Sequence, residues 1–236
     1  MKHGPTNTRV LRDLKTSLHL SDLQREIVIG TILGDGCLIT SRSGRAARLQ
    51  VRHQLKHSAY VDWKYQYFLE WVTTAPRFDR FNNSVVFRTV SHPDLMDIKR
   101  LFYTGVTKIV PSNIDKILKT PLSLAIWFMD DGTYYRDALY YKLCSYGFGE
   151  DGNILLRNCL DKNFHVQTKI CNDGKGYYLS IPFYGAVRLY ELVKPHVVPC
   201  MLYKLSNADR YLINVDPVET DPQVRLTSER KVSTSL

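Results

Sequence analysis

The sequence lacks the long hydrophobic runs that mark membrane-spanning and secreted proteins. No stretch comes near the roughly 18 apolar residues that a membrane-spanning helix requires. The opening residues, MKHGPTNTRVLRDLK, also lack the apolar core of a secretory signal peptide. We therefore expect an intracellular protein with no membrane partner.

The chain also has no recognisable cysteine framework. Its cysteines are odd in number and scattered, and no two of them form the C-x-x-C pair typical of structural zinc sites. Neither structural zinc nor a set of structural disulfides is expected. The five cysteines are Cys37, Cys144, Cys159, Cys171 and Cys200.

Acidic residues are outnumbered by basic ones, which predicts a polyanionic partner. Lys and Arg together number 32 against 23 Asp and Glu, so the formal net charge is +9. Nucleic acid is the polyanion that remains once a membrane is set aside. The 236 residues, 44% of them hydrophobic, suffice for one large domain or two small ones.

One segment is free of acidic residues altogether. Between Asp35 and Asp62 the charged residues are all basic. Within it, Leu49 and Val51 alternate with Arg and Gln, which predicts a strand with one apolar and one polar face. Arg and Gln suit the guanine and adenine edges of the DNA major groove. We expect the following residues of this segment to contact DNA: Arg42, Arg45, Arg48, Gln50 and Arg52.

Other hairpins carry further candidates for DNA contact. Tyr140 and Lys142 would serve in the second half of the chain as the basic strand does in the first. Any one of these residues, taken alone, could equally be a solvated surface group. As a set they favour a DNA-binding surface, and the remaining members are Arg77, Arg80, Arg88, Arg136, Lys169 and Lys175.

The order of predicted elements occurs twice. An apolar helix that Ser21 or Asp22 could cap is followed by a hairpin, a helix, a second hairpin and a third helix. The helices of the first set cover 22–34, 57–72 and 93–103, with the second hairpin turning at Asn82 and Asn83. Those of the second set cover 123–132, 149–163 and 184–193, with a hairpin at 133–146 and another turning at 172–174.

Two offsets support this duplication. The distance along the chain from Asp35 to Asp131, and that from Pro111 to Pro199, are each about 90 residues. We predict an N-terminal extension at 1–20, a first half at 21–113, a second half at 114–206 and a polar tail at 207–236.

Each half opens with a helix that ends in a carboxylate, Asp35 or Asp131. A negative charge is disfavoured at a helix C-terminus, where the helix dipole already places partial negative charge. Each Asp-Gly taken alone is explained as a helix end before a turn. Gly30 and Gly34, however, form a ridge of small residues that lets another helix pack closely, which would bring both carboxylates together. A bound Mg²⁺ (or Mn²⁺) would relieve their repulsion.

The sequence resembles the LAGLIDADG homing endonucleases that carry two motifs on one chain. The motifs are VIGTILGDG at 28–36 and LAIWFMDDG at 124–132, and WFMDDG followed later by YKL is similar to the branch of group I intron endonucleases in yeast mitochondria. The resemblance covers residues 22–206. It implies an α+β fold of two pseudo-symmetric αββαββα halves whose antiparallel sheets form a saddle over DNA. It also implies a monomer that cuts both strands of a long, non-palindromic site with Mg²⁺.

The resemblance further implies a role for each matching residue. Asp35 and Asp131 would bind metal, helped by the carbonyls of Gly34 and Asp130. One lysine per half, Lys108 and Lys204, would lie near the scissile phosphates. Lys116 is the alternative in the first half, because it follows Pro111 by the interval at which Lys204 follows Pro199. Gln54 would orient water, and its apparent counterpart in the second half is Tyr146.

Several alternatives remain open at the level of sequence. The protein could be an RNA-binding intron maturase or a catalytically inactive DNA-binding regulator; retention of both aspartates argues against the latter. We expect no intein origin, because the chain starts at Met1 and has no His-Asn end. His53 and His57 are not expected to share a metal, and the stripe of Tyr60, Trp63, Tyr67 and Trp71 is expected to be core. The compartment is either an organelle or a prokaryotic cytoplasm.

Overall fold

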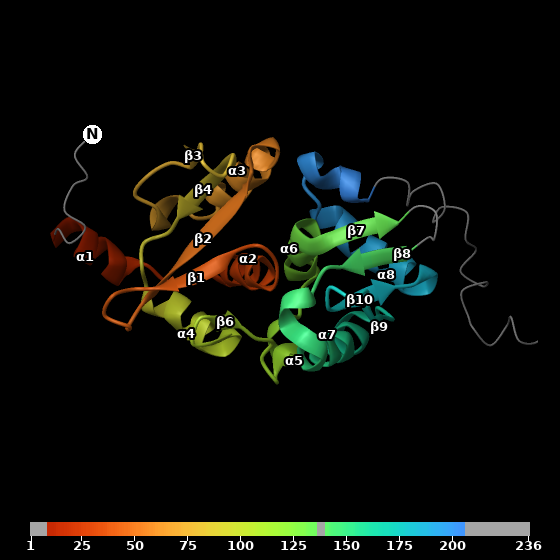
Figure 1. The fold of residues 1–236 in the computed structure, drawn as a ribbon. Helices are drawn as coiled ribbons and strands as arrows, with labels where there is room; N and C mark the ends of the chain where they lie inside the picture. Colours follow the sequence, from red (N-terminus) through yellow and green to blue (C-terminus); the bar gives the residue numbers. More distant parts are fainter. Residues whose placement is uncertain (1–8, 136–139, 206–236) are drawn as a thin grey trace, which may run out of the picture.

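The computed structural model describes residues 9–135 and 140–205, and it folds as two repeats of one arrangement (Figure 1). The first repeat runs α2 (Asp22–Leu33), β1 (Cys37–Thr40), β2 (Ala47–Gln54), α3 (Ser58–Gln66), β3 (Arg77–Asp79), β4 (Ser84–Arg88) and α4 (Pro93–Phe102). The second runs α6 (Pro121–Asp131), β7 (Gly132–Tyr135), β8 (Tyr140–Leu143), α7 (Gly149–Phe164), β9 (Lys169–Asn172), β10 (Tyr177–Ile181) and α8 (Phe183–Val193).

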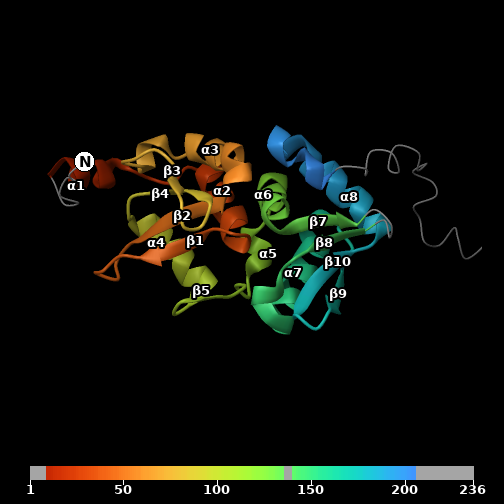
Figure 2. The same cartoon turned by 45° about the horizontal axis from the view of Figure 1, so that its top comes forward.

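Each repeat contains a four-stranded antiparallel sheet. The strand orders are β1-β2-β4-β3 and β7-β8-β10-β9, so the two sheets have the same topology. Helices α3 and α4 pack on the first sheet, and α7 and α8 on the second. Both views show α2 and α6 side by side between the sheets (Figures 1 and 2). The predicted α+β class with a repeated antiparallel arrangement is confirmed.

The elements outside this repeat were not predicted. The segment at 1–20 contains α1 (Arg9–Ser17). A short hairpin, β5 (Tyr103–Thr104) with β6 (Thr107–Lys108), and helix α5 (Ile114–Ile117) join the two repeats. The helix predicted at 57–72 is shorter than expected, because after α3 the hydrogen bonds tighten and the last turn, Leu69–Trp71, is a 3-10 helix.

Helix α2 begins where the sequence predicts. The Ser21 side chain accepts a hydrogen bond from the Gln24 amide at 3.2 Å, and the Gln24 side chain accepts one from the Ser21 amide at 3.1 Å. This reciprocal capping box satisfies two amides that no helical carbonyl reaches. The helix ends at Gly34. Both ends of the first motif helix are therefore determined locally.

The two motif helices lie in the middle of one continuous core. Residues 27–33 of α2 and 123–129 of α6 are all buried, so these helices are covered on every side. The aromatic stripe of α3 and the turns that follow it joins the same core: Tyr60 and Trp71 are buried, and Trp63 and Tyr67 pack against it. The assignment of this stripe to the core is confirmed. Among the helices that the structure describes, none is both long and apolar enough to cross a bilayer.

Glycines allow α2 and α6 to approach closely. A Cβ atom added at Gly30 would lie 2.5 Å from the main-chain oxygen of Ser123, and one added at Gly34 would collide with the Asp130 side chain. The ridge of small residues thus lies in the helix interface, as predicted.

A methyl group at Gly30 should therefore force the two helices apart. We expect Gly30→Ala to lower the free energy of unfolding by about 1–3 kcal/mol, although alanine is the better helix former, because a backbone atom cannot move aside cheaply. Urea denaturation measures this loss. Gly147→Ala is the control, because nothing lies within 4 Å of the added atom. An equal effect of both changes would contradict close packing at Gly30.

Candidate active site

The two motif helices end side by side, each with a lysine bonded to its last turn. The Lys108 ammonium donates a hydrogen bond to the carbonyl oxygen of Gly34 at 2.6 Å. The Lys204 ammonium donates one to the carbonyl oxygen of Asp130 at 2.8 Å. In both halves the accepting residue immediately precedes the motif aspartate, Asp35 or Asp131. The two halves thus repeat one arrangement with residues far apart in sequence.

This geometry distinguishes the two lysines considered for the first half. Lys108 ends strand β6 and reaches the C-terminus of α2, whereas Lys116 lies exposed on α5. The charge of Lys108 also acts on Asp131 and Asp35, as does that of Lys204. The structure therefore favours Lys108 over Lys116.

The motif aspartates stand in an environment that opposes their negative charge. Burial, together with the carboxylates of Asp130 and Asp35, raises the pKa of Asp131 to about 8, against the opposing charges of Lys108 and Lys204. Burial and the Asp130 carboxylate also raise the pKa of Asp35, although its side chain is 52% exposed. Burial also lowers the pKa of Lys108 and of Lys204. Carboxylate and carbonyl oxygens with unmet negative charge fit a hard divalent cation.

These pKa values predict how metal binding and protons compete. Because the folded-state pKa of Asp131, about 8, exceeds its ordinary value of 3.8, folding favours the protonated acid. The contribution of this group to stability is present at pH values below its ordinary pKa and is lost as the pH rises towards 8. A divalent cation held by this side chain would need its charged form, so binding of that cation near pH 7 should release a proton.

Calorimetric titration of the protein with Mg²⁺ in two buffers of different ionisation enthalpy measures that proton. Asp131→Asn is the matched variant, and it should release none at this position. The same proton release from both proteins would show that Asp131 is not the group that titrates.

A third carboxylate, that of Asp130, lies beside this pair, and its side chain is completely buried. Its side chain accepts two hydrogen bonds from the Lys64 ammonium, at 3.0 and 3.1 Å, and one from the Asp35 amide at 3.2 Å. Lys64 is also fully buried and lies over the Tyr60 ring. Asp130 therefore ties the second motif helix to the end of the first.

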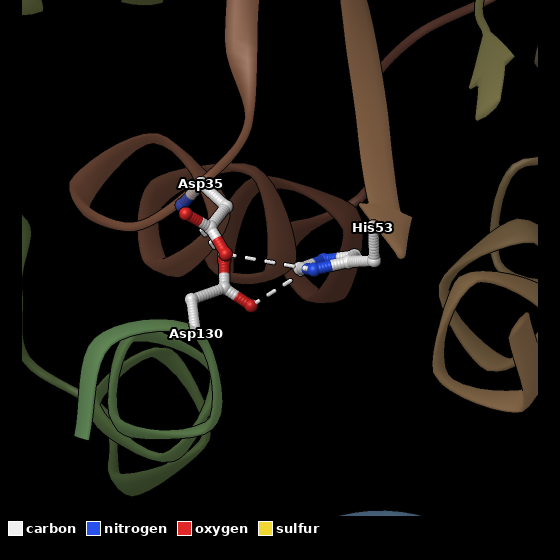
Figure 3. A group of neighbouring side chains, drawn as sticks. All are labelled: Asp35, His53 and Asp130. Carbon is white, nitrogen blue, oxygen red and sulfur yellow. Dashed lines mark hydrogen bonds and ion pairs between the residues drawn. The ribbon is translucent and has the colours of Figure 1, made fainter. Parts of the chain in front are cut away.

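His53 completes this cluster from strand β2 (Figure 3). Its Nδ1 lies 3.5 Å from Asp35 and its Nε2 lies 3.7 Å from Asp130. Burial lowers the pKa of His53 to about 4, so the ring is neutral near pH 7. Although these three side chains could in principle hold a metal, both carboxylate oxygens of Asp130 already accept hydrogen bonds from the Lys64 ammonium, and one of them also accepts from the Asp35 amide. The Asp130 side chain thus stabilises the site, and its carbonyl remains the predicted ligand.

Lys64 was not predicted from the sequence, although a signal for it was present. Lys64 lies on the buried face of α3 between Tyr60 and Tyr67, where a charged side chain needs a buried partner. The role of His53 beside Asp35 and Asp130 was not predicted either, because the sequence places it only near His57. The two rings have different neighbours: His53 lies between Asp35 and Asp130, whereas His57 stacks on Tyr203 with ring centroids 5.9 Å apart.

The predicted DNA-contacting residues of the first half share one face of their sheet. Along β2, buried residues alternate with Arg48, Gln50, Arg52 and Gln54, as the sequence pattern predicts. An open hollow of about 510 Å³ connects Asp35 with this face, and Gln54 is exposed in it. Arg88 donates to the Gln50 side chain at 2.6 Å. The other four candidates are exposed: Arg42, Arg45, Arg77 and Arg80.

The corresponding face of the second half is aromatic. Tyr140 stacks on Tyr135 with ring centroids 4.8 Å apart. Lys142 is largely buried, and its ammonium binds Asp173, which also accepts a hydrogen bond from the Tyr146 hydroxyl. Lys169 and Lys175 are exposed, and Arg136 lies outside the described residues. That these side chains contact DNA stays a prediction.

Comparison with known proteins places this arrangement in a family. Residues 25–184 match the model of the LAGLIDADG DNA endonuclease family, which is well over half of the chain. The chain belongs to this family. It is therefore a DNA endonuclease by family and a phosphodiester hydrolase by chemistry. Nucleases of this family use divalent metal ions.

Individual relatives resemble the chain over most of its length. DNA endonuclease I-ChuI of Chlamydomonas applanata is 30% identical over 82% of this chain and 99% of that protein. The homing endonuclease I-WcaI, in a structure bound to its DNA recognition sequence, is 28% identical with a TM-score of 0.78 over 87% of this chain and 95% of that one. Cytochrome b mRNA maturase bI2 of Debaryomyces hansenii is 26% identical over 77% and 73%. The chain also spans about half of Protein RecA of Mycobacterium gastri, at 29% identity over 89% of this chain and 54% of that one.

Proposed function

We propose that this LAGLIDADG protein is a homing endonuclease that cuts both strands of DNA at one long, non-palindromic site. The observation that carries the proposal is the pair of motif helices, which end together at Asp35 and Asp131, each with a lysine bonded to the preceding carbonyl. A protein that only bound DNA would gain nothing from aspartates whose negative charge is opposed by burial.

The chain's own residues divide the work as follows. Asp35 and Asp131 would hold a divalent cation, Mg²⁺ or Mn²⁺, with the carbonyl oxygens of Gly34 and Asp130. Such an ion activates a water molecule and stabilises the departing oxygen. A carbonyl oxygen has two lone pairs, so each can accept from its lysine and still face a cation. Lys108 and Lys204 would lie beside the scissile phosphates, and Gln54, exposed in the hollow beside Asp35, would orient water.

The DNA would lie across the polar faces of the two sheets. The first sheet presents arginine and glutamine side chains, and the second presents tyrosines. Because the donors and acceptors of the two faces differ, the two sides of the target should differ in sequence. One chain already carries both motif aspartates, so a monomer suffices. Selection of cleaved sites from a randomised DNA library, with Mg²⁺ and without it, tests the proposal directly.

A single base-reading residue should affect only one side of the cut. We expect Gln50→Ala to relax base preference on the side that faces the first sheet, by about 1–3 kcal/mol at the base pairs concerned. A cleavage profile over all single-base variants of the selected site measures this loss. Arg157→Ala, on the helix behind the second sheet, is the control. A palindromic site, or an obligate homodimer in sedimentation, would refute the two-sided interpretation.

A maturase activity is the second candidate, because the relatives include an mRNA maturase. Splicing of the host intron RNA with and without the protein tests it. An organelle is the proposed compartment, since relatives described as intron-encoded or as an mRNA maturase come from eukaryotes.

A further inference from the structure

Two cations of the predicted DNA face are not free in this structure. In the first sheet, Arg52 bonds the Asp79 carboxylate at 2.5 Å and the Ser84 hydroxyl at 3.1 Å. In the second, Lys142 bonds the Asp173 carboxylate at 2.8 Å and lies over the Tyr178 ring at 3.7 Å. Each sheet therefore has one central cation that an aspartate holds in place.

The two aspartates occupy the same kind of position. Asp79 is the last residue of β3, and Asp173 follows the last residue of β9. Each is at the start of the turn that joins the outermost strand of its sheet to the next one. Strand pairing puts Asp79 on the polar face, because it is opposite Ser84, which is opposite Gln54. Each carboxylate thus reaches across a strand to the cation.

Both aspartates also use their two oxygens in the same way. In each aspartate, Oδ1 accepts a hydrogen bond from the main-chain amide two residues further along the chain, which stabilises the turn. The donor is Phe81 for Asp79 and Lys175 for Asp173, both at 3.2 Å. In each aspartate, Oδ2 accepts a hydrogen bond from the cation and one from a further donor. The further donor is the Asn82 side-chain amide for Asp79 and the Tyr146 hydroxyl for Asp173. Hydrogen bonds from Asn82 and then Arg52 lower the pKa of Asp79 to about 2. Hydrogen bonds from Lys142 and then Tyr146 lower the pKa of Asp173 to about 2. Both carboxylates are charged at neutral pH.

Negative charge on a surface that binds DNA has a cost, because phosphates repel it. A carboxylate held against a cation, however, cancels a charge that would otherwise attract the phosphates of any sequence. The carboxylate also orients the remaining N–H groups of the cation. Hydrogen bonds to base edges depend more on such orientation than contacts with phosphates do.

We infer that Asp79 and Asp173 are specificity-determining residues, which withhold Arg52 and Lys142 from the phosphates of non-target DNA and orient them towards base edges. This inference rests on the proposed function, since it requires that DNA lies on these faces. Arg48 and Lys169 act differently: no ion-pair partner is recorded for either among residues 9–135 and 140–205, so they contribute to binding of any sequence.

The experiment uses the whole 236-residue chain and compares the cations that an aspartate holds, Arg52 and Lys142, with those unpaired in the described part of the chain, Arg48 and Lys169. The probe for non-target binding is a short duplex of mixed sequence, and its affinity is measured over a range of salt concentrations in Ca²⁺ buffer. Asp79→Asn should steepen the log–log salt dependence by about one unit, because Arg52 then neutralises a phosphate. Asparagine keeps an Oδ1 acceptor for the Phe81 amide, so the turn is retained. The preference for the selected target over the mixed duplex should fall at least about tenfold.

Asp79→Asn in an Arg52→Ala background distinguishes the release of Arg52 from the simple loss of a negative charge. There, Asp79→Asn still removes a negative charge from the surface, but no cation is released, so the salt dependence should not steepen. Asp173→Asn with Lys142→Ala forms the equivalent cycle in the second half.

Two single substitutions give an independent readout. Arg52→Gln should leave the salt dependence of non-target binding unchanged, whereas Arg48→Gln should flatten it by about one unit. Lys142→Gln and Lys169→Gln form the matching pair. The inference would be overturned if Arg52→Gln and Arg48→Gln changed the salt dependence equally. It would also be overturned if Asp79→Asn steepened the salt dependence equally with and without Arg52→Ala. If the wild-type protein binds the mixed duplex with no salt dependence at all, the proposed function itself fails.

Discussion

Asp35→Asn and Asp131→Asn should each abolish double-strand cleavage while DNA binding survives. We expect the rate of cleavage to fall roughly a thousandfold or more, because an amide cannot supply the negative charge that holds the cation. The amide has the same size as the acid, so helix packing is retained, and the cations of the two sheets still bind the duplex. Plasmid cleavage and gel mobility shift measure the two properties separately.

Stability should change in the opposite direction to activity. Because burial opposes the charge of Asp131, the neutral Asp131→Asn side chain should raise the melting temperature of the metal-free protein at pH values above the raised pKa. Asp97→Asn serves as the control, since that aspartate is exposed and pairs with Arg100 on the surface. Undiminished cutting by either motif variant would remove that aspartate from the active site.

The second large effect is expected from Lys64→Met, which should lower the free energy of unfolding by about 3–5 kcal/mol. The substitution leaves the Asp130 carboxylate fully buried without its ammonium partner. Adding Asp130→Asn to the same protein should recover most of the loss, because the amide oxygen still accepts from the Asp35 amide and carries no charge.

The matched control is a Lys–Asp pair on the surface. Lys162 pairs with Asp115, and the Lys162 side chain is 68% exposed. Lys162→Met should therefore cost less than about 1 kcal/mol. Denaturant titrations of the four proteins give the comparison. If Lys64→Met proved as mild as Lys162→Met, the buried pair would contribute no more than a surface one.

The order of elements was predictable because it rests on patterns that neighbouring residues impose. Alternation in β2, the capping box at Ser21 and the turns at Asn83 and Gly174 all act within a few residues. The helix interface could also be predicted, because Gly30 and Gly34 are spaced one helical turn apart.

The contacts around the site were less accessible, because they join residues that only the fold brings together. Lys64 meets Asp130 across 66 residues, and Lys108 meets Gly34 across 74. The hold of Asp79 on Arg52 depends on strand register, which the short strand β3 does not specify by itself. The sequence pointed to Lys108 through a resemblance and to Lys116 through its spacing from Pro111, and in the structure it is Lys108 that donates a hydrogen bond to the end of a motif helix.

The unequal partners of Asp130 bear on how such a chain could have diverged from two copies of one half. The three residues that meet this carboxylate, Lys64, His53 and Asp35, all come from the first half. Two second halves joined together would bury two such carboxylates with none of these partners. Two first halves would bury two ammonium groups opposite glycine. Because the two helix ends are unlike, neither half can replace the other without leaving a buried charge unpaired.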